Sequence, residues 1–221
     1  MGSYRRLAAI TATAIPLLAS APANAHPHML ADARLDVTLS TDRQTIASLR
    51  HIWRFDEVSS SMMLVDLDQN GDMTLDQAEL TEASKIMMES LAEFNYFQIV
   101  TADGQDVVMN APSEIKAVWE NNLLYVMLET TPKEPFRLAG KINLSVYDPT
   151  FYVAIDFAED DKMVVAELPA SCTRQVIRPD ADEAIAQNQA TLDQAFKDDS
   201  ANNDMSKIFA TRLELTCQAS G

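Results

Sequence analysis

The chain of 221 residues has few basic side chains, and it has no long apolar run after residue 25. Its 17 lysines and arginines are outnumbered by 33 aspartates and glutamates, which gives a formal net charge of −16. A charge of this sign repels phosphate backbones and anionic lipids, so the composition argues against nucleic acid and anionic membranes as partners. It also raises the local concentration of divalent cations, although an acidic surface is common among soluble proteins.

Motifs of catalysis are also missing. The sequence contains no G-x-S-x-G nucleophile elbow, no H-E-x-x-H zinc motif and no glycine-rich phosphate loop. Paired carboxylates are present, but in so acidic a chain they indicate little about acid–base chemistry. We therefore predict a protein that is not an enzyme.

Residues 1–25 have the layout of a secretory signal peptide. Arg5 and Arg6 form the charged start, a short apolar run follows, and A-N-A at residues 23–25 is a small-residue cleavage site. The run is too short to span a bilayer. We expect a single mature domain of residues 26–221 that is exported to the periplasm and does not span the membrane.

Cysteine is scarce, with only Cys172 and Cys217. In an oxidising compartment two cysteines usually pair, so we predict a disulfide that tethers the C-terminal segment 173–221. Two free buried thiols are the alternative. A redox or thiolate-metal site is disfavoured because no C-x-x-C spacing exists.

Alternating apolar and polar residues predict strands over most of the chain. Residues 30–39 alternate, and residues 45–55 alternate again after a turn, which predicts a hairpin. On the second strand we expect one apolar face, made of Ala47, Leu49, His51, Trp53 and Phe55. Two further hairpins are expected, within 96–110 about Asp103-Gly104 and within 113–130 about Asn121-Asn122. More strands are expected within 141–168 and 211–217. The predicted fold class is mostly β with an α insert, built as an antiparallel β-sandwich.

The spacing becomes helical at about residues 56–95, which predicts a helix–loop–helix inserted after the second strand. The expected apolar positions are Val58, Met62 and Val65 on the first helix, and Leu80, Ala83, Met87, Leu91 and Phe94 on the second. Another helix is expected over 181–197, near the C-terminus.

The segment between these two helices, DQNGDMTLDQAE, resembles an EF-hand calcium loop. A frame that begins at Asp66 puts Gly71 sixth but ends on Gln77, which has no carboxylate. A frame that begins at Asp68 is preferred because it ends on a glutamate. Its ligands would be Asp68, Asn70, Asp72, Thr74 (through its carbonyl) and Glu79.

Met73 stands where this frame expects glycine. A non-glycine residue in left-handed space costs about 1–2 kcal/mol, so calcium affinity should fall about tenfold without being abolished. The acidic residues also suit a helix capping box, with Asp76 and Glu79 or with Thr74 and Gln77. The loop is therefore expected either to bind structural calcium or only to start a helix.

Cleavage after Ala25 would expose the terminus His26-Pro27-His28. One amine and two imidazoles make a nitrogen cluster suited to zinc, nickel or copper. Pro27 has no N–H, so the common amino-terminal copper and nickel chelate, which uses backbone amides, cannot form. We predict a transition-metal site, zinc or nickel, at His26 and His28. A frayed terminus with two solvated rings is the alternative.

Other ligands for this site would come from elsewhere in the chain. The candidates are His51, Asp56, Glu57 and Asp148. His51 lies on an apolar strand face, so a hydrogen-bonded core histidine is favoured over a ligand. Asp148 belongs to the tight turn Y-D-P-T, which it is expected to cap.

Several segments together resemble the periplasmic proteins grouped as domain of unknown function 1007. They are H-P-H with D-A-R-L, W-R-F-D-E, D-L-D-Q-N-G-D, S-V-Y-D-P-T-F-Y-V-A and the late cysteines. The resemblance implies a periplasmic component that accompanies a nickel/cobalt-type metal permease or takes part in zinc uptake. It also implies metal handling at His26 and His28, and the calcium-like loop.

Three functions are carried forward. The leading one is a periplasmic metal-binding accessory that passes zinc or nickel/cobalt to an inner-membrane metal permease. The second is a calcium-stabilised adaptor that binds a protein partner. The third, a copper oxidase with a terminal-histidine brace, would need His51 beside His26.

Overall fold

The computed structural model describes residues 27–195 and 206–218. The predicted signal peptide and His26 therefore lie outside the described residues. In the described ranges the helices are α1 (Glu57–Leu67), α2 (Gln77–Ala92) and α3 (Ala181–Ala195). The strands are β1 (Met29–Leu39), β2 (Ile46–Phe55), β3 (Gln98–Ala102), β4 (Gln105–Asp106), β5 (Met109–Asn110), β6 (Ile115–Glu120), β7 (Leu123–Pro132), β8 (Gly140–Val146), β9 (Val153–Asp156), β10 (Met163–Val165), β11 (Cys172–Ile177) and β12 (Arg212–Cys217). The mostly-β prediction is confirmed.

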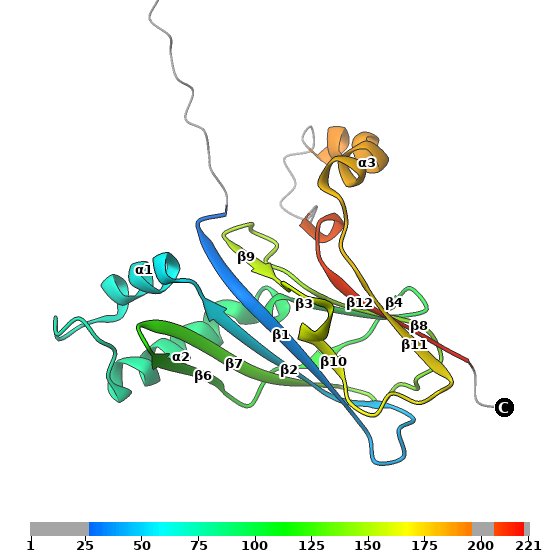
Figure 1. The fold of residues 1–221 in the computed structure, drawn as a ribbon, viewed down its shortest axis with the longest axis horizontal. Coiled ribbons are helices and arrows are strands. Elements are labelled where there is room, and N and C mark those ends of the chain that lie inside the picture. The colour runs from blue at the N-terminus through cyan, green and yellow to red at the C-terminus, as the bar shows by residue number, and fades with distance from the viewer. Residues whose placement is uncertain (1–26, 196–205, 219–221) are drawn as a thin grey trace, which may run out of the picture.

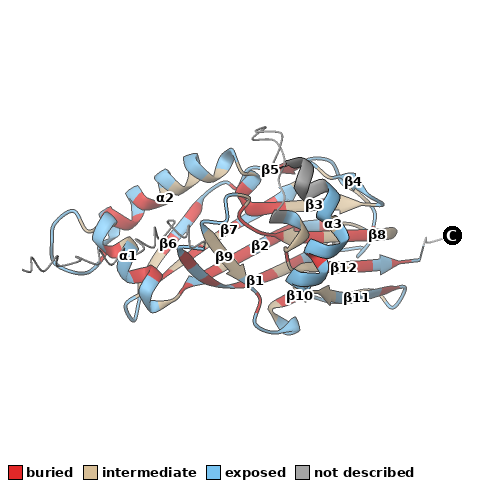
Figure 2. Cartoon of the chain, turned by 90° about the horizontal axis from the view of Figure 1, so that it is seen from above, coloured by how far each residue is buried: buried red, intermediate tan, exposed pale blue. Residues whose placement is uncertain are grey.

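The strands form two sheets (Figure 1). One has seven strands in the order β10-β1-β2-β7-β5, with β6 also on β7 and β9 also on β1. The other has five strands in the order β11-β12-β8-β3-β4. Buried side chains from both sheets form one hydrophobic cluster, so the two sheets share a core (Figure 2).

The expectation of purely antiparallel strands is wrong at β9 and β10. Both pair with β1 in parallel, with Ala31 beside Ile155 and Leu35 beside Met163. The chain leaves β8 in the other sheet, turns through 147–152, and reaches β1 already running in the same direction. Alternating side chains show which face of a strand is buried, but the same alternation occurs in parallel and antiparallel strands.

Two of the predicted hairpins form in full, and the one about Asp103-Gly104 forms in part, because β4 pairs with β3 whereas β5 pairs with β7. β1 pairs with β2, and β6 pairs with β7 across Asn121 and Asn122, whose φ angles of 54° and 61° suit a tight hairpin turn. The face assigned to β2 is correct except at Ala47, which is exposed, while Ile46 is buried. The register of β1 and β2 shifts between Thr38 and Leu39, so Ala47 is the extra residue of a bulge.

The two helices follow β2, as expected, but the apolar face predicted for α1 is wrong. Val58 is 68% exposed, Met62 44% and Val65 76%, whereas Ser59, Ser60 and Leu64 are buried. For α2 the prediction is correct at Leu80 and Ala83, which are buried. Helix α2 lies along β6, with its outer side exposed (Figure 2).

The predicted disulfide between Cys172 and Cys217 is present. The two cysteines are register partners at one end of β11 and β12, so the bond closes a pair that the strands already align. Helix α3 lies within the chain segment that this bond closes. No helix within 27–195 and 206–218 is long and apolar enough to cross a lipid bilayer.

Candidate functional site

The first described residues, 27–29, form a segment that is held in place against Tyr152, here called the docked segment. The backbone N–H groups of His28 and Met29 both donate to the carbonyl of Tyr152, at 2.9 and 3.1 Å. The rings of His28 and Tyr152 lie 5.2 Å apart between centroids. The His28 side chain is exposed, so it occupies a defined place while its ring remains accessible.

Tyr152 belongs to a turn that Asp148 organises. Asp148 is 4% exposed, and its Oδ1 accepts bonds from the Thr150 N–H at 2.8 Å and the Thr150 hydroxyl at 2.7 Å. Its Oδ2 accepts from the Val153 N–H at 2.9 Å. These bonds hold Phe151 at φ 59°, a left-handed conformation that is rare for a bulky residue. Both carboxylate oxygens are therefore engaged in shaping the turn, as the sequence suggested for this aspartate.

A cavity of about 380 Å³ lies beside the docked segment. Pro27, Asp148 and Asp156 line it, together with the aromatic rings of Phe151 and Phe209, which lie 6.2 Å apart. Asp156 is exposed and is the last residue of β9. The sequence reasoning missed Asp156, because nothing in the one-dimensional pattern shows that β9 runs beside the start of β1.

His51 lies elsewhere, in the core. It is 1% exposed, and its Nε2 is 3.1 Å from the Gln98 Oε1, which also accepts from the Thr130 hydroxyl at 2.9 Å. Burial lowers the pKa of His51 from 6.5 to about 4, and the bond to Gln98 offsets this only in part. The ring is therefore neutral at pH 7, consistent with the favoured core histidine.

The place of His51 along β2 separates it from the start of the chain. It pairs with Leu35 of β1, which follows His28 by seven residues. At about 3.3 Å per strand residue, that offset corresponds to roughly 23 Å. His51 is therefore not available to a metal site at His28. His26, which a copper brace with His51 would need, lies outside the described residues.

The segment between α1 and α2 is shaped by its own acidic side chains. The Asp68 carboxylate accepts from the N–H groups of Gly71 at 2.7 Å and Met73 at 2.9 Å. Asn70 and Asp72 accept from N–H groups two residues further on, at 2.9 and 3.1 Å. Met73 has φ 61°, so the sixth residue of the frame from Asp68 does take the left-handed conformation.

Glu79 folds back over this segment from the first turn of α2. Its Oε1 accepts from the Gln69 N–H at 2.8 Å, and its Oε2 accepts from the Asp76 N–H at 2.9 Å. Asp76 in turn accepts from the N–H groups of Ala78 and Glu79, which completes a capping box. The capping prediction is confirmed, and the same glutamate also joins the two ends of the loop.

These groups do not converge as a ready metal site. In the described part of the chain, no three or more His, Cys, Asp and Glu side chains are grouped so as to hold a metal ion. The carboxylates of Asp68 and Glu79 accept hydrogen bonds from backbone N–H groups. Thr74 is exposed, and its N–H donates to Asp72.

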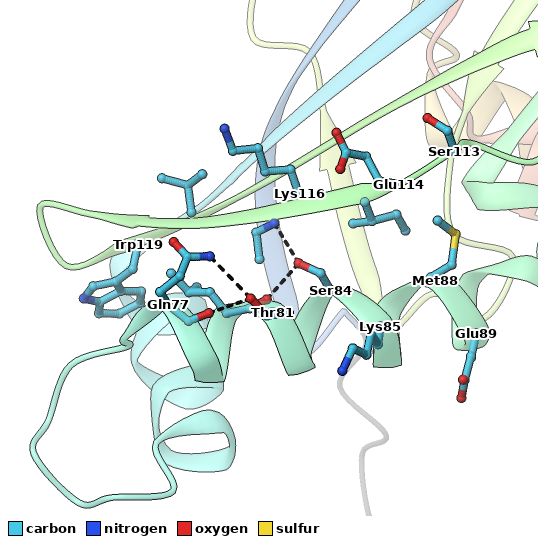
Figure 3. Close-up of a pocket in the computed structure, with 14 residues that line it drawn as sticks. Gln77, Thr81, Ser84, Lys85, Met88, Glu89, Ser113, Glu114, Lys116 and Trp119 are labelled. Carbon is cyan, nitrogen blue, oxygen red and sulfur yellow. Dashed lines mark hydrogen bonds between the residues drawn. The ribbon is translucent and has the colours of Figure 1, made fainter.

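A groove of about 740 Å³ runs between α2 and β6 (Figure 3). Lys85 and Glu89 on the helix and Glu114 and Lys116 on the strand side give it both signs of charge. The Ser84 hydroxyl accepts from the Ala117 N–H at 3.1 Å. Helix α2 therefore covers the open edge of β6, which would otherwise offer unpaired backbone groups to another strand.

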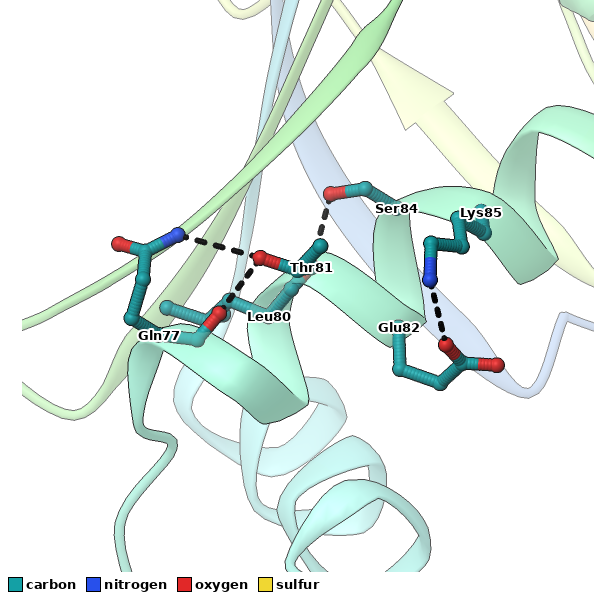
Figure 4. A network of polar contacts seen from close by, with 6 residues as sticks. All are labelled: Gln77, Leu80, Thr81, Glu82, Ser84 and Lys85. Atoms are coloured by element: carbon teal, nitrogen blue, oxygen red, sulfur yellow. Dashed lines mark hydrogen bonds and ion pairs between the residues drawn. The ribbon is translucent and has the colours of Figure 1, made fainter.

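The other polar side chains on this part of α2 bond within the helix (Figure 4). The Thr81 hydroxyl donates to the Gln77 carbonyl at 2.6 Å, and Lys85 pairs with Glu82 at 3.1 Å. None of these groups converges on a common point in the groove. The groove is therefore the packing boundary between helix α2 and the sheet. The docked segment at His28 remains the better candidate for a functional site.

The segments joined at this site are the ones that carry the family resemblance. The second histidine of H-P-H, His28, lies in the docked segment, and Y-D-P-T-F-Y supplies the turn that receives it. A family model described as "Protein of unknown function (DUF1007)" matches residues 11–217. The chain belongs to the DUF1007 family. The DUF1007 match covers both segments, the loop after α1 and both cysteines.

A relative from Haemophilus influenzae strain Rd, described as an uncharacterized protein, is 24% identical over 199 residues. The aligned region covers 88% of this chain and 92% of the relative. The similarity therefore extends over nearly the whole length of both proteins, and it supplies no activity that could be transferred.

Proposed function

We propose that this DUF1007 protein is a periplasmic, non-enzymatic metal-binding accessory of a zinc or nickel/cobalt transport system, with an inner-membrane metal permease as its partner. The observation that carries the proposal is the docking of His28 on Tyr152, which gives an accessible imidazole a fixed place. A frayed segment at His28 would have no such bonds. An ordered ligand loses less conformational freedom when it binds a metal.

The proposed site forms when the signal peptide is removed. Cleavage after Ala25 leaves a free amine on His26, two residues before the docked His28. The amine and the two rings are nitrogen ligands of the kind that zinc and nickel accept. Asp156, which lines the cavity beside Pro27, is a candidate carboxylate ligand. The buried Asp148 acts as a positioning residue, because it shapes the turn that holds His28.

In this proposal the sheets and the helix–loop–helix have structural roles. The two sheets form a β-sandwich, and α1, the loop and α2 form an EF-hand-like unit that binds one calcium ion through Asp68, Asn70, Asp72, the Thr74 carbonyl and Glu79. Calcium would draw the Asp68 and Glu79 carboxylates away from the backbone N–H groups they now contact. With Met73 sixth, this site is expected to be weak.

The test compares two forms of the mature protein, one beginning at His26 and one with a single alanine added before it. Zinc and nickel affinities are measured by calorimetry, and bound metals by elemental analysis. The native terminus should bind at least tenfold more tightly, which is about 1.4 kcal/mol. Equal affinities in the two forms would refute the amino-terminal site.

The second candidate is a calcium-stabilised adaptor with no transition-metal task. It is favoured by Glu79, which already links the loop to α2. Millimolar calcium should then raise the melting temperature, and Glu79→Gln should remove the rise. Glu82→Gln is the matched control, because Glu82 lies one turn later on α2 and pairs with Lys85 at the surface. No calcium-dependent shift in the unmodified protein would exclude this candidate.

A further inference from the structure

Helix α1 exposes an apolar side and buries polar residues, which is the reverse of an ordinary surface helix. Three apolar residues at helical spacing, Val58, Met62 and Val65, form one exposed stripe, here called the α1 stripe. The two serines on the opposite side, Ser59 and Ser60, are buried. Buried polar groups and a row of exposed large apolar groups are the informative departures from the usual pattern.

Hydrogen bonds fix this orientation. The Ser59 hydroxyl accepts from the Leu30 N–H of β1 at 2.8 Å. The Ser60 hydroxyl accepts from the Leu124 N–H of β7 at 3.0 Å and donates to the Phe55 carbonyl at 3.2 Å. A rotation of α1 that buried the stripe would leave these backbone groups without partners. The stripe is therefore held outward by the fold.

The chain segment that carries the stripe has charged residues of one sign only. Between Phe55 and Ser84 the sequence contains eight acidic residues and neither lysine nor arginine. Glu57 and Asp66, on α1 itself, are exposed. A second copy of this chain would bring the same acidic segment against itself, and an anionic membrane would be repelled as well. The complementary surface is apolar and basic.

We propose that the α1 stripe is a docking surface for a basic, amphipathic segment of a partner protein. Apolar side chains of that segment would cover Val58, Met62 and Val65, and its lysines or arginines would face Glu57 and Asp66. Apolar burial would provide affinity, and the opposite charges would speed and orient the encounter. Val58, Met62 and Val65 are not among the candidate ligands of the histidine site, so variants at these positions test this proposal separately from that one.

The test uses the full mature protein and a synthetic 18-residue peptide whose leucines and lysines lie on opposite faces of a helix. Binding is followed by calorimetry at low and high salt. Combining Val58→Ser with Val65→Ser should weaken binding at least tenfold. Val108→Ser is the matched control, because Val108 is 64% exposed and lies outside the stripe, and it should leave the affinity unchanged.

A second pair of variants tests the charges without altering the stripe. Glu57→Gln with Asp66→Asn should weaken binding and reduce its salt dependence, whereas Glu134→Gln, an exposed acid beyond the segment, should change neither. Unchanged affinity in the double serine variant would overturn the proposal. So would a dimer of the unmodified protein, detected by sedimentation, that the double serine variant dissociates, because the occupant would then be a second copy.

Discussion

Burial of His51 makes the stability of this protein depend on pH in a range where few other groups titrate. The ring is 1% exposed, and its pKa is lowered from 6.5 to about 4 by loss of solvation. In the unfolded chain the ring takes up a proton near pH 6.5. In the folded chain it stays neutral until about pH 4, so acid favours the unfolded state.

The direction and size of the effect follow from these two pKa values. The contribution of His51 is fully present above pH 6.5 and is lost as the pH falls toward 4. At 1.36 kcal/mol per pKa unit, lowering the pKa of His51 from 6.5 to about 4 corresponds to roughly 3 kcal/mol. At pH 5 the expected loss is about 2 kcal/mol relative to pH 7.5.

The assay is urea unfolding at pH 7.5, 6 and 5, on the unmodified protein and on two variants. His51→Gln should be less stable at pH 7.5, but its free energy of unfolding should fall by about 2 kcal/mol less between pH 7.5 and 5. Thr130→Val removes a neighbouring hydrogen bond to Gln98 without removing a titrating group, so it should keep the full pH dependence. If His51→Gln retained that dependence too, the burial argument would be refuted.

Three further predictions concern folding and the loop. Replacing Cys172 and Cys217 with alanine opens a link across 45 residues and should lower the free energy of unfolding by roughly 4 kcal/mol, measured in urea. Ser60→Ala leaves the buried Leu124 N–H without its acceptor and should cost about 1–3 kcal/mol in the same assay. Met73→Gly removes strain at φ 61° and should stabilise the protein by about 1 kcal/mol in a thermal melt; if the loop binds calcium, affinity measured by calorimetry should rise about tenfold.

The predictions that rested on local chemistry were the most accurate. The asparagine pair at 121–122, the capping box at Asp76 and Glu79, and the left-handed residue at Met73 depend on neighbours within a few positions. The disulfide followed from there being only two cysteines in a chain read as exported. Each of these features is specified by groups that the sequence places side by side.

The errors arose where a distant segment decided the outcome. Helical spacing identified the apolar side of α1, but Leu30 and Leu124 supply backbone N–H groups that draw Ser59 and Ser60 inward instead. Ala47 was misplaced because a bulge depends on the partner strand as well as on the residue itself. Asp156 was missed because the parallel pairing of β9 with β1 joins segments about 120 residues apart.

The position of β12 has a consequence for how the protein folds during synthesis. β12 lies between β11 and β8, and its Leu213 pairs with Leu144. The five-stranded sheet therefore cannot close until residues 212–217 have arrived, however early the first hairpin forms. Until then β8 presents an unpaired, largely apolar edge, which is a site for aggregation. A truncation before Arg212 would make that exposure permanent, so the last strand governs solubility as well as architecture.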